Sequence, residues 1–369
     1  MFEPVGFGVV RETLPRERRV ALTPQGAEQL IALGHAVLLG SGAGVAAGFA
    51  DDDYRAVGAT VCLSDREVAT SADVLVKIHG PRKDEPDLFT EGGTVTGFMH
   101  LSNPEASEIR STMRDRKMNA IAWELLEEND GARPALEAVS AIGGRVAILL
   151  AARHLLSSDG GTGRLLGGAP GVPPLSVVVI GAGAAGEAAA REAHRMGAQV
   201  TVFDQDSRAL TRVARRIDGI ITAIASGPFL DASIGRADLI VAAVASPGRP
   251  APKIVTRRHV RGMPQGAMII DMSVDEGGCC ETTRQAADDG SYIEEGVLHI
   301  CVPNLPSEVA QTASVAFTNA ILPYLVALGE TGVQGALSAE PALYRGAVYV
   351  DGVLRNTVVA ELSGEPLGA

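Results

Sequence analysis

One stretch constrains the fold of this chain more than any other: an apolar, β-branched run that leads directly into a glycine motif. The run covers residues 176–180, and the next six residues read Gly-Ala-Gly-Ala-Ala-Gly. Such a run is typical of a strand buried on both faces. In the turn, Gly181 permits the bend, Gly183 lets the backbone approach a pyrophosphate, and Gly186 allows the next helix to pack on the strand. The motif predicts a dinucleotide site.

The residues after the glycines strengthen this prediction. An Ala-rich helical run offers its N-terminal amides to the phosphates, and a second apolar strand follows and ends at Asp204, 18 residues after Gly186. A carboxylate at that place accepts hydrogen bonds from the adenosine ribose and repels a 2′-phosphate. An ordinary glycine turn before a buried helix is the alternative, but it does not require this order of elements. The segment therefore predicts a Rossmann unit that binds NAD rather than NADP.

Length and charge limit the remaining possibilities. At 369 residues, the chain is long enough for about two domains. Its residues are 46% apolar but only 4% aromatic, which is typical of an α/β protein with Val, Ile, Leu and Ala cores. The net charge of −12 argues against a nucleic-acid partner.

The cysteines point to a reducing compartment. They are Cys62, Cys279, Cys280 and Cys301, and their spacing matches neither a disulfide framework nor the CxxC pairs of a zinc site. We therefore expect buried thiols and no metal, although a reactive thiol is an open alternative. The N-terminus lacks the pattern of a signal peptide, and no stretch reads as long and uninterrupted enough to span a bilayer. These features predict a soluble, cytoplasmic protein with no membrane partner.

Strands and helices alternate along the first 134 residues. An apolar strand over 5–10 precedes a charged loop over 11–19, and a helix follows with Thr23 as its N-cap and Pro24 at its first position. Further strands are predicted to end at His79 and at His100. Alternation of this kind predicts a mostly parallel, doubly wound sheet.

The rest of the chain predicts a second domain and a return to the first. A long helix from about 135 to 156 leads into the Rossmann domain, which extends to 311. A helix over 314–328 should be interrupted at Pro323. The tail is too polar and Gly-rich to form a domain, so we expect 312–369 to pack against 1–134. The predicted fold is α/β, with two doubly wound domains: a Rossmann NAD-binding domain and a discontinuous, Rossmann-like one.

Three polar residues stand where ligands bind in the first domain, near the carboxyl ends of strands. Arg19 follows the charged loop and is suited to a bidentate contact with a carboxylate. His100 is suited to general acid/base chemistry near neutral pH, and His79 ends the neighbouring strand. The alternatives are a solvated arginine and structurally satisfied histidines.

Two residues stand at comparable places in the second domain. Asp275 lies in the loop beyond the strand over 268–271, where a nicotinamide would lie, and Asn304 follows the strand over 299–302. Each is also a common turn residue.

Several of these motifs together resemble the bacterial alanine dehydrogenases, in order and spacing over nearly the entire chain. The resemblance rests on Arg19-Val-Ala-Leu-Thr-Pro24, Met99-His-Leu101, Gly181–Gly186, Asp271–Gly278, Pro303-Asn-Leu-Pro306, Thr318-Asn-Ala320 and Pro323-Tyr324. The wider family includes the NAD-binding subunit of proton-translocating transhydrogenase. The resemblance implies a discontinuous substrate domain of 1–134 and 312–369, an NAD-binding domain of 135–311, and commonly a hexamer.

The resemblance also implies roles for individual residues. Arg19 would bind the substrate carboxylate, and His100 would be the acid/base. Asp275 would position substrate and nicotinamide or relay a proton. NAD would contact Ser140, Asp204 and Asn304, together with the three glycines of the motif. The substrate would be a small amino acid or keto acid.

The chain departs from the family at His79. The family has a second lysine here that binds and polarises the keto acid, and a glutamate follows it where this chain has Gly80. Lys77 matches the first lysine of the family. Residues 139–141 read Val-Ser-Ala in place of the common Met-Ser-Glu. The departure makes His79 a candidate for both catalysis and substrate binding.

These observations lead to one main interpretation and two alternatives. The main interpretation is an NAD-dependent amino-acid dehydrogenase that deaminates an L-amino acid oxidatively to a 2-keto acid and catalyses the reverse reaction. An imine-reducing or transhydrogenase-like oxidoreductase with an altered substrate is the first alternative. A non-catalytic NAD-binding relative is the second, and only the missing lysine favours it.

Overall fold

The computed structural model describes residues 4–244, 249–284 and 290–368, and these form two compact units. The first unit combines the described residues up to 139 with Arg249 and 307–368, and the second combines those of 140–244 and 250–306. One division lies within the helix α5 (Pro134–His154) and the other within a short 3₁₀ helix, η6 (Leu305–Val309). Both divisions therefore fall inside helical segments, a few residues from the boundaries predicted at 134 and 311.

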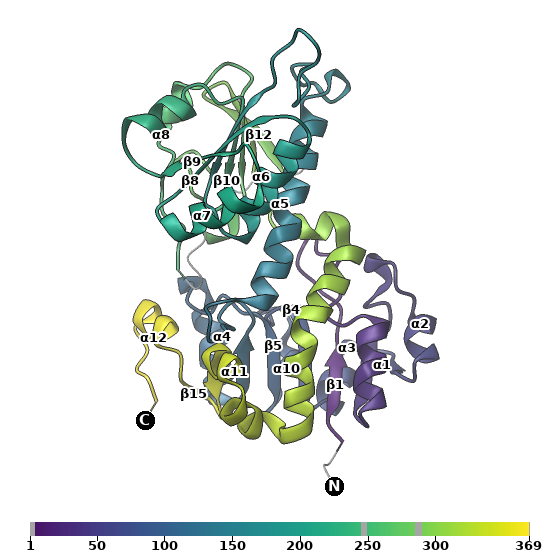
Figure 1. The fold of residues 1–369 in the computed structure, drawn as a ribbon. Helices are drawn as coiled ribbons and strands as arrows, with labels where there is room; N and C mark the ends of the chain where they lie inside the picture. The colour runs from purple at the N-terminus through teal and green to yellow at the C-terminus, as the bar shows by residue number, and fades with distance from the viewer. Residues whose placement is uncertain (1–3, 245–248, 285–289, 369) are drawn as a thin grey trace. The chain divides into compact units, whose positions relative to one another are not determined.

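The described strands of the first unit form one eight-stranded sheet in the order β15-β14-β6-β5-β4-β1-β2-β3 (Figure 1). The pairs from β3 to β6 are parallel, and β14 joins β6 in the antiparallel sense. The order reverses between β1 and β4, which is where doubly wound sheets bind ligands. The strands are β1 (Gly6–Val9), β2 (Ala36–Gly40), β3 (Thr60–Cys62), β4 (Val74–His79), β5 (Thr94–Phe98), β6 (Asn119–Ala122), β14 (Ala347–Val350) and β15 (Val353–Leu354).

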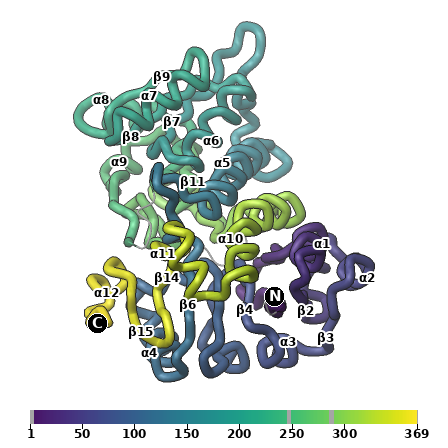
Figure 2. Tube along the Cα trace, turned by 60° about the horizontal axis from the view of Figure 1, so that its bottom comes forward, coloured from purple at the N-terminus to yellow at the C-terminus, as the bar shows by residue number. Residues whose placement is uncertain are grey.

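Helices cover both faces of this sheet. One apolar core lies under α1, α2, α10 and α11, and a second lies under α3, α4 and α12. In Figures 1 and 2, α1 and α10 lie side by side although they are far apart in the sequence. The helices are α1 (Pro24–Ala32), α2 (Asp51–Ala56), α3 (Asp65–Ser71), α4 (Ser107–Asp115), α10 (Ala310–Ala339), α11 (Pro341–Gly346) and α12 (Thr357–Ser363), with the 3₁₀ turns η1 (Val45–Ala47), η2 (Pro86–Leu88) and η3 (Pro104–Ala106).

Helix α1 begins as predicted, but α10 does not break where predicted. Thr23 caps α1 by accepting the N–H of Gly26, and Pro24 is its first residue. Helix α10 continues through Pro323 and is interrupted instead at Gly332, where φ is 66°. The flanking Leu322 and Leu325 are buried in the core, and this packing outweighs the hydrogen bond that a proline removes.

The tail completes the first unit rather than only packing against it. Its strand β14 pairs with β6 and with β15, so residues from both ends of the chain share one sheet. The predicted discontinuous α/β fold is therefore present. The prediction of a polar tail overlooked β14, whose four residues are all apolar and are buried in the two cores on either side of the sheet.

The described strands of the second unit form a seven-stranded sheet in the order β12-β13-β11-β10-β7-β8-β9. The order again reverses beside the first strand, between β7 and β10. The strands are β7 (Ser176–Ile180), β8 (Gln199–Asp204), β9 (Ile221–Ile224), β10 (Leu239–Ala242), β11 (Met268–Asp271), β12 (Ser291–Glu294) and β13 (Val297–Ile300). The helices after α5 are α6 (Ala184–Arg195), α7 (Ser207–Arg216), α8 (Gly227–Ile234) and α9 (Arg257–Arg261), with the 3₁₀ turns η4 (Ser157–Asp159) and η5 (Val274–Glu276).

The last strands of this sheet differ from the prediction of a strand over 299–302. They form an antiparallel hairpin, β12–β13, that turns at Glu295 and Gly296, whose φ angles are 53° and 79°. Two adjacent positive φ angles suit a two-residue hairpin turn, and the Glu-Gly pair was its only local signal.

Two helical segments are long and apolar enough, by length and composition, to cross a membrane, contrary to the prediction that no stretch would be. They are Pro134–His154 and Leu305–Ala339, and 44% and 56% of their most apolar windows are buried inside the structure. Helices that pack in the core of soluble proteins meet the same criterion.

Candidate active site

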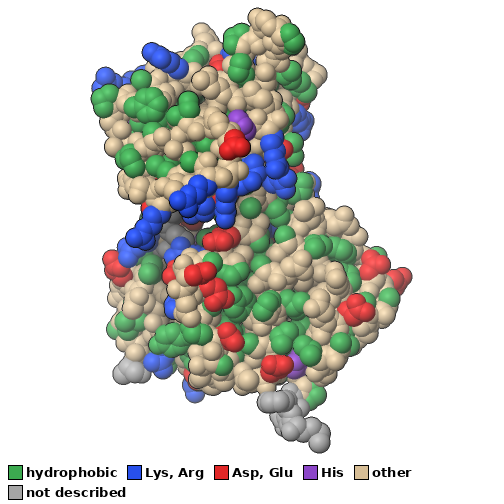
Figure 3. All heavy atoms as spheres, in the orientation of Figure 1, with side chains coloured by type: hydrophobic (Ala, Val, Ile, Leu, Met, Phe, Trp, Pro, Cys, Tyr) green, Lys and Arg blue, Asp and Glu red, His purple; other side chains and the backbone are tan. Residues whose placement is uncertain are grey.

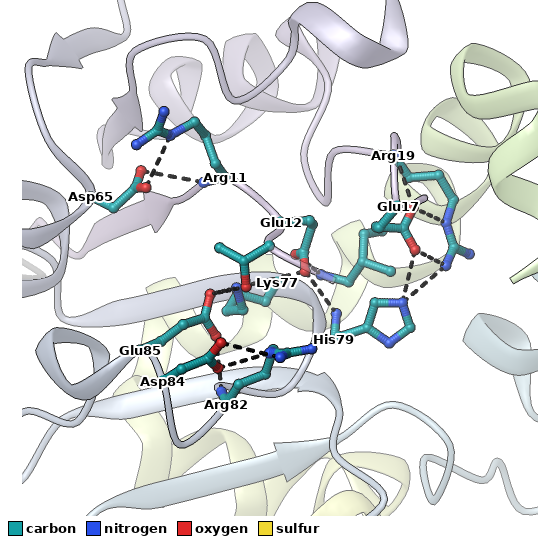
Figure 4. Close-up of polar contacts among 12 residues, drawn as sticks. Arg11, Glu12, Glu17, Arg19, Asp65, Lys77, His79, Arg82, Asp84 and Glu85 are labelled. Carbon is teal, nitrogen blue, oxygen red and sulfur yellow. Dashed lines mark hydrogen bonds and ion pairs between the residues drawn. The ribbon is translucent and has the colours of Figure 1, made fainter. Parts of the chain in front are cut away.

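The candidate site of the first unit lies at the switch point of its sheet. The charged loop after β1 carries Glu12, Glu17 and Arg19 past the end of β4, and β4 ends at His79. Although much of the loop is exposed, the side chains of Glu17 and Arg19 are buried. Figure 4 shows these side chains turned toward one another.

A buried carboxylate joins Arg19 to His79. Arg19 donates from Nε to Glu17 Oε1 at 2.8 Å and from Nη2 to Glu17 Oε2 at 2.6 Å. His79 Nε2 lies 2.8 Å from Glu17 Oε2 and 3.4 Å from Arg19 Nη2. Because an ionised carboxylate only accepts, the imidazole donates from Nε2 in the shorter contact. The structure thus brings two of the predicted residues together through a third that was not predicted.

Glu17 remains ionised in this environment. Burial alone would raise its pKa, but hydrogen bonds from Arg19 and His79 lower the pKa well below its usual value. The same carboxylate also accepts the backbone N–H groups of Arg18 and Arg19 at 3.1 and 2.9 Å. Glu17 therefore fixes both the side chain of Arg19 and the loop that carries it.

Arg19 keeps one edge available for a ligand. Its Nε–Nη2 edge is occupied by Glu17, whereas its Nη1 has no hydrogen-bond partner among the described residues. A guanidinium can bind a carboxylate through its Nη1–Nη2 edge as well. Arg18, in contrast, is exposed. Among the neighbouring arginines, Arg19 is the one that is prepared for bidentate recognition.

Lys77 belongs to a different cluster. Its Nζ lies 3.6 Å from Glu12 Oε2 and 3.4 Å from Glu85 Oε1, and the lysine is 1% exposed. The pairing of β4 with β5 shifts register between Val76 and His79. A bulge of this kind changes the directions of the side chains that follow it. Lys77 and His79, two residues apart, consequently point to different partners (Figure 4).

Distant residues hold the Arg19 loop in place. The Ser307 hydroxyl accepts the N–H of Arg18 at 2.8 Å, and on α10 the Ser314 hydroxyl accepts the N–H of Val20 at 2.9 Å. Thr318 accepts the N–H of Thr23 at 3.0 Å and donates to the carbonyl of Ala21 at 3.2 Å. The second chain segment of this unit therefore positions the loop that the first segment supplies.

His100 follows β5, next to β4 in the sheet, in a left-handed conformation with φ of 46°. The buried carboxylate of Glu124 supports it. Glu124 accepts the N–H of Met99 at 3.0 Å and the N–H of His100 at 2.7 Å. A left-handed histidine is uncommon and persists only where its surroundings impose it. The half-buried imidazole is thus set on a fixed backbone.

The glycine motif of the second unit has the shape that a pyrophosphate site needs. Gly181 has φ of 104°, and a Cβ on Gly186 would lie only 1.8 Å from the Gly181 carbonyl oxygen. A Cβ on Gly183, in contrast, would meet no described atom within 4 Å. The first glycine makes the turn, the third allows close packing, and the second leaves open backbone where phosphates bind. The residues present therefore fit a dinucleotide.

Asp204 lies beside the same turn. Its Oδ2 accepts the N–H of Ala182 at 2.6 Å, and Oδ1 accepts the N–H of Asp206 at 2.8 Å. Arg212 donates to the carbonyl of Ala182 at 2.6 Å. These bonds fix the orientation of the carboxylate that was predicted to select NAD.

Basic side chains surround a second carboxylate near this turn. Lys and Arg side chains gather over α7 on the face shown in Figure 3. Glu187 binds Arg191, Arg212 and Arg216 at 2.6, 3.2 and 3.1 Å. Although burial raises the pKa of Glu187, the three arginines lower it further than burial raises it. The cluster ties α6 to α7 beside the glycine motif.

The other predicted residues of the second unit lie on two loops and on α5. Asp275 is exposed in η5, within a loop anchored by the fully buried Asp271, whose carboxylate accepts the N–H groups of Ser273 and Cys279 at 3.0 and 2.7 Å. Asn304 is left-handed, with φ of 55°. Ser140 is half-buried on α5.

The thiols are not reactive centres. All four cysteines are free and buried, as predicted. Burial and the nearby Asp271 carboxylate raise the pKa of Cys279 to about 11, so this thiol is protonated at neutral pH. Among the described residues, no group of His, Cys, Asp and Glu side chains is arranged to hold a metal ion.

Sequence reasoning missed the carboxylates that organise the site. Glu17 falls within the predicted charged loop over 11–19 without a role of its own, and Glu124 lies outside every predicted motif. Their only local signals are their positions, Glu17 two residues before Arg19 and Glu124 just after β6. Burial, which gives them their role, comes from contacts with residues far along the chain.

Comparison with known proteins identifies the family. The domain descriptions "Alanine dehydrogenase/PNT, N-terminal domain" and "Alanine dehydrogenase/PNT, C-terminal domain" match residues 8–143 and 147–357. An alanine dehydrogenase of Methanococcus maripaludis is 36% identical over 98% of this chain and 97% of its own length. One of Mycobacterium tuberculosis is 38% identical over 97% of each chain. A solved L-alanine dehydrogenase superposes with a TM-score of 0.91 and 34% identity, covering 98% of this chain and 99% of its own. The chain belongs to the alanine dehydrogenase/PNT family.

Proposed function

We propose that this protein is an NAD-dependent alanine dehydrogenase. It deaminates L-alanine oxidatively to pyruvate and ammonia, and it catalyses the reverse reductive amination. The observation that carries the proposal is the buried Arg19 at the switch point of the first sheet. Glu17 fixes its guanidinium group, and the free edge of that group suits a small carboxylate. Family membership supports the same reaction.

Residues of the first unit have different roles in binding and converting the amino acid. Arg19 binds the substrate carboxylate through its Nη1–Nη2 edge. His100 accepts a proton from the water that attacks the oxidised α-carbon, and it returns a proton in the reverse direction. Loss of ammonia then leaves the keto acid. His79, held by Glu17 beside Arg19, offers the substrate a further hydrogen-bonding group.

The residues of the second unit fit the cofactor. Gly181, Gly183 and Gly186 shape the pyrophosphate site, and Asp204 accepts hydrogen bonds from the ribose. Ser140 and Asn304 make further contacts with the dinucleotide, and Asp275 orients the substrate and the nicotinamide end. When bound, NAD accepts the hydride from the α-carbon of the amino acid.

The alternatives receive less support. A transhydrogenase-like role would not require an arginine prepared to bind a carboxylate. A non-catalytic role rests on the missing lysine alone. In this chain Glu17, Arg19 and His79 form a complete hydrogen-bonded group, so the site is altered rather than dismantled.

An assay of NAD reduction over a panel of L-amino acids tests the proposal. L-alanine should be turned over, and NADH should be oxidised by pyruvate with ammonia. His100→Ala should lose about 10²–10⁴-fold in turnover while it keeps its fold and binds NAD, because general acid/base groups contribute this much. Lack of turnover with every amino acid, or full activity in folded His100→Ala, would contradict it.

We also propose that the protein is soluble and cytoplasmic and that it assembles as a homo-oligomer, a hexamer by resemblance to its family. The net charge of −12 and the free thiols support the first part. Light scattering of the purified protein measures the second.

A further inference from the structure

The loop that follows His100 is tied to helix α4 by one arginine. Arg110, on α4, is 4% exposed, and its Nη1 donates to the carbonyl oxygens of Leu101 and Asn103 at 2.8 and 2.9 Å. The N–H of Asn103 in turn donates to the carbonyl of His100 at 3.1 Å. One buried cation thus holds both ends of the turn that begins at His100.

The C-terminal segment fixes this arginine from its other side. Arg110 Nε donates to Glu365 Oε1 at 2.6 Å, and Tyr349 donates its hydroxyl hydrogen to Glu365 Oε2 at 3.0 Å. Glu365 follows α12, which ends at the left-handed Gly364. In Figure 2, α4 and β15 lie together at the edge of the sheet from which this segment leaves. The tail therefore supplies the counter-charge of Arg110.

Glu124 and Arg110 hold the backbone before and after His100. Glu124 accepts the N–H groups of Met99 and His100, and Arg110 binds the carbonyls that follow. Left-handed backbone costs free energy at a non-glycine residue, so it relaxes when its support is removed. Displacement of an acid/base group by about 1 Å can reduce turnover ~10²-fold.

We propose that Arg110 is a positioning residue for His100 and that Glu365 of the C-terminal segment holds Arg110 in the orientation that this role needs. The inference rests on the proposed role of His100. It assigns to the last residues of the chain a function in catalysis, although they touch neither the Arg19 group nor the glycine motif. Arg110 acts through the backbone and does not contact the substrate.

A neighbouring arginine provides the matched control. Arg114 lies one helical turn further along α4, pairs with Glu365 Oε2 at 3.7 Å, and is half exposed. It has no hydrogen bond to the loop over 99–103 among the described contacts. Arg114→Ala therefore removes a cation from Glu365 without freeing the loop, and it should leave turnover unchanged.

A double-mutant cycle separates positioning from general destabilisation. Arg110→Ala should lower kcat for alanine about 10- to 100-fold with a much smaller change in KM, because Arg19 still binds the carboxylate. In a His100→Ala background the same substitution should cost less than about twofold, because the group that it positions is gone. Guanidinium ions should restore part of the loss. An equal loss in both backgrounds would overturn the proposal.

Glu365→Ala and hydrogen exchange keep the inference testable if Arg110→Ala folds poorly or if alanine is not the substrate. Glu365→Ala should lower kcat in the same direction as Arg110→Ala. Followed by mass spectrometry, amide exchange over 99–106 should accelerate in both variants and not in Arg114→Ala. This readout needs no activity, so accelerated exchange in a protein without turnover would count against the proposed function alone. Unchanged exchange and unchanged kcat in folded Glu365→Ala and Arg110→Ala would overturn the positioning role.

Discussion

At the scale of single residues, the site is organised by a carboxylate rather than by its cations. Glu17 receives hydrogen bonds from Arg19 and from His79, and all three side chains are held within one buried group. Burial of one charge without the others would be strongly unfavourable. The group therefore acts as a unit, and each of its members can be tested against an exposed neighbour.

Arg19→Ala should raise the KM for alanine or abolish turnover while NAD binding persists. A hydrogen bond between charged groups contributes about 1.5–3 kcal/mol, and the substrate carboxylate would lose the guanidinium group that binds it. Steady-state kinetics with calorimetric titration of NAD measure both effects. Arg18→Ala is the control, since Arg18 is exposed and should change little. Similar kinetics for the two variants would show that the wrong arginine was chosen.

Glu17→Gln should destabilise the protein by about 3–5 kcal/mol at neutral pH, because it leaves the buried guanidinium of Arg19 without its charged partner. The pKa of Glu17 is lowered from its usual value of 4.5, so the stabilisation that it gives is complete above that value and decreases as the pH falls below it. The difference between the two proteins in free energy of unfolding should accordingly narrow at about pH 3.5. Urea unfolding at both pH values checks this.

The exposed Glu308, which lies 3.8 Å from Arg16, supplies the matching substitution for that experiment. Glu308→Gln should change the stability by less than about 1 kcal/mol, as is usual for surface pairs. If Glu17→Gln proved equally mild, the buried group would not stabilise the fold.

His79→Lys should increase the turnover of alanine and pyruvate. Lysine carries a fixed positive charge, whereas histidine changes charge near neutral pH and is shorter. The unmodified protein should therefore hold a small keto acid less strongly and accept larger amino acids. Assays of both proteins over a panel of amino and keto acids check this. Vigorous alanine turnover that falls on introducing lysine would show that histidine performs the role of the family lysine.

The sequence singled out candidate ligand-binding residues but not the residues that hold them in place. Arg19 and His100 stood in motifs and at strand ends, where position alone indicates a ligand site. Glu17 and Glu124 carried no such signal, because a glutamate in a loop is usually solvated. What distinguishes them is burial, which arises only in the folded chain. For Glu17, the folded chain brings Ser307 and α10 against the loop that carries it.

At the scale of elements, α10 holds the backbone at the end of the charged loop and so fixes the position of Arg19. Its Ser314 and Thr318 satisfy backbone groups of the segment over 20–23, almost 300 residues earlier in the chain. Gly26 allows this approach, since a Cβ there would lie 2.4 Å from Thr318. The capping of α1 was predictable from Thr23 and Pro24, but the continuity of α10 past Pro323 was not, because tertiary packing decided it.

Thr318→Val should lower the free energy of unfolding by about 1–3 kcal/mol, because two buried backbone groups lose their partner while the side-chain volume stays the same. It should also raise the KM for alanine by loosening the Arg19 loop. Thr331→Val on the exposed part of the same helix removes only a bond to Ala327 and should be nearly neutral. Equal effects in the two variants would mean that the contact of α10 with the loop is not important.

At the scale of the whole molecule, the parallel strands of the two sheets share one order, and each sheet has polar groups at its switch point. This architecture followed from the alternation of strands and helices. The antiparallel strands β14, β15 and β12 did not follow, because strands of two to four residues are too short to show a periodic pattern of their own. The second unit offers the sharpest test of cofactor choice.

Asp204 should make the protein prefer NAD to NADP by at least about tenfold in affinity, or ~1.4 kcal/mol. Its carboxylate is held by Ala182 and Asp206, so it cannot swing away from a 2′-phosphate without breaking both bonds. Asp204→Asn retains an acceptor for the Ala182 N–H and removes the charge, and it gives up the bond from the Asp206 N–H because an amide nitrogen only donates. Arg212, bound to the carbonyl of the same Ala182, then supplies a cation near the turn, so affinity for NADP should increase.

Asp206→Asn, a neighbouring change at the N-cap of α7, should leave the ratio of affinities unchanged. Fluorescence titration with NADH and NADPH measures all three proteins. Equal affinities in the unmodified protein would contradict the role of Asp204. An unchanged ratio in Asp204→Asn would show that shape rather than charge selects the cofactor.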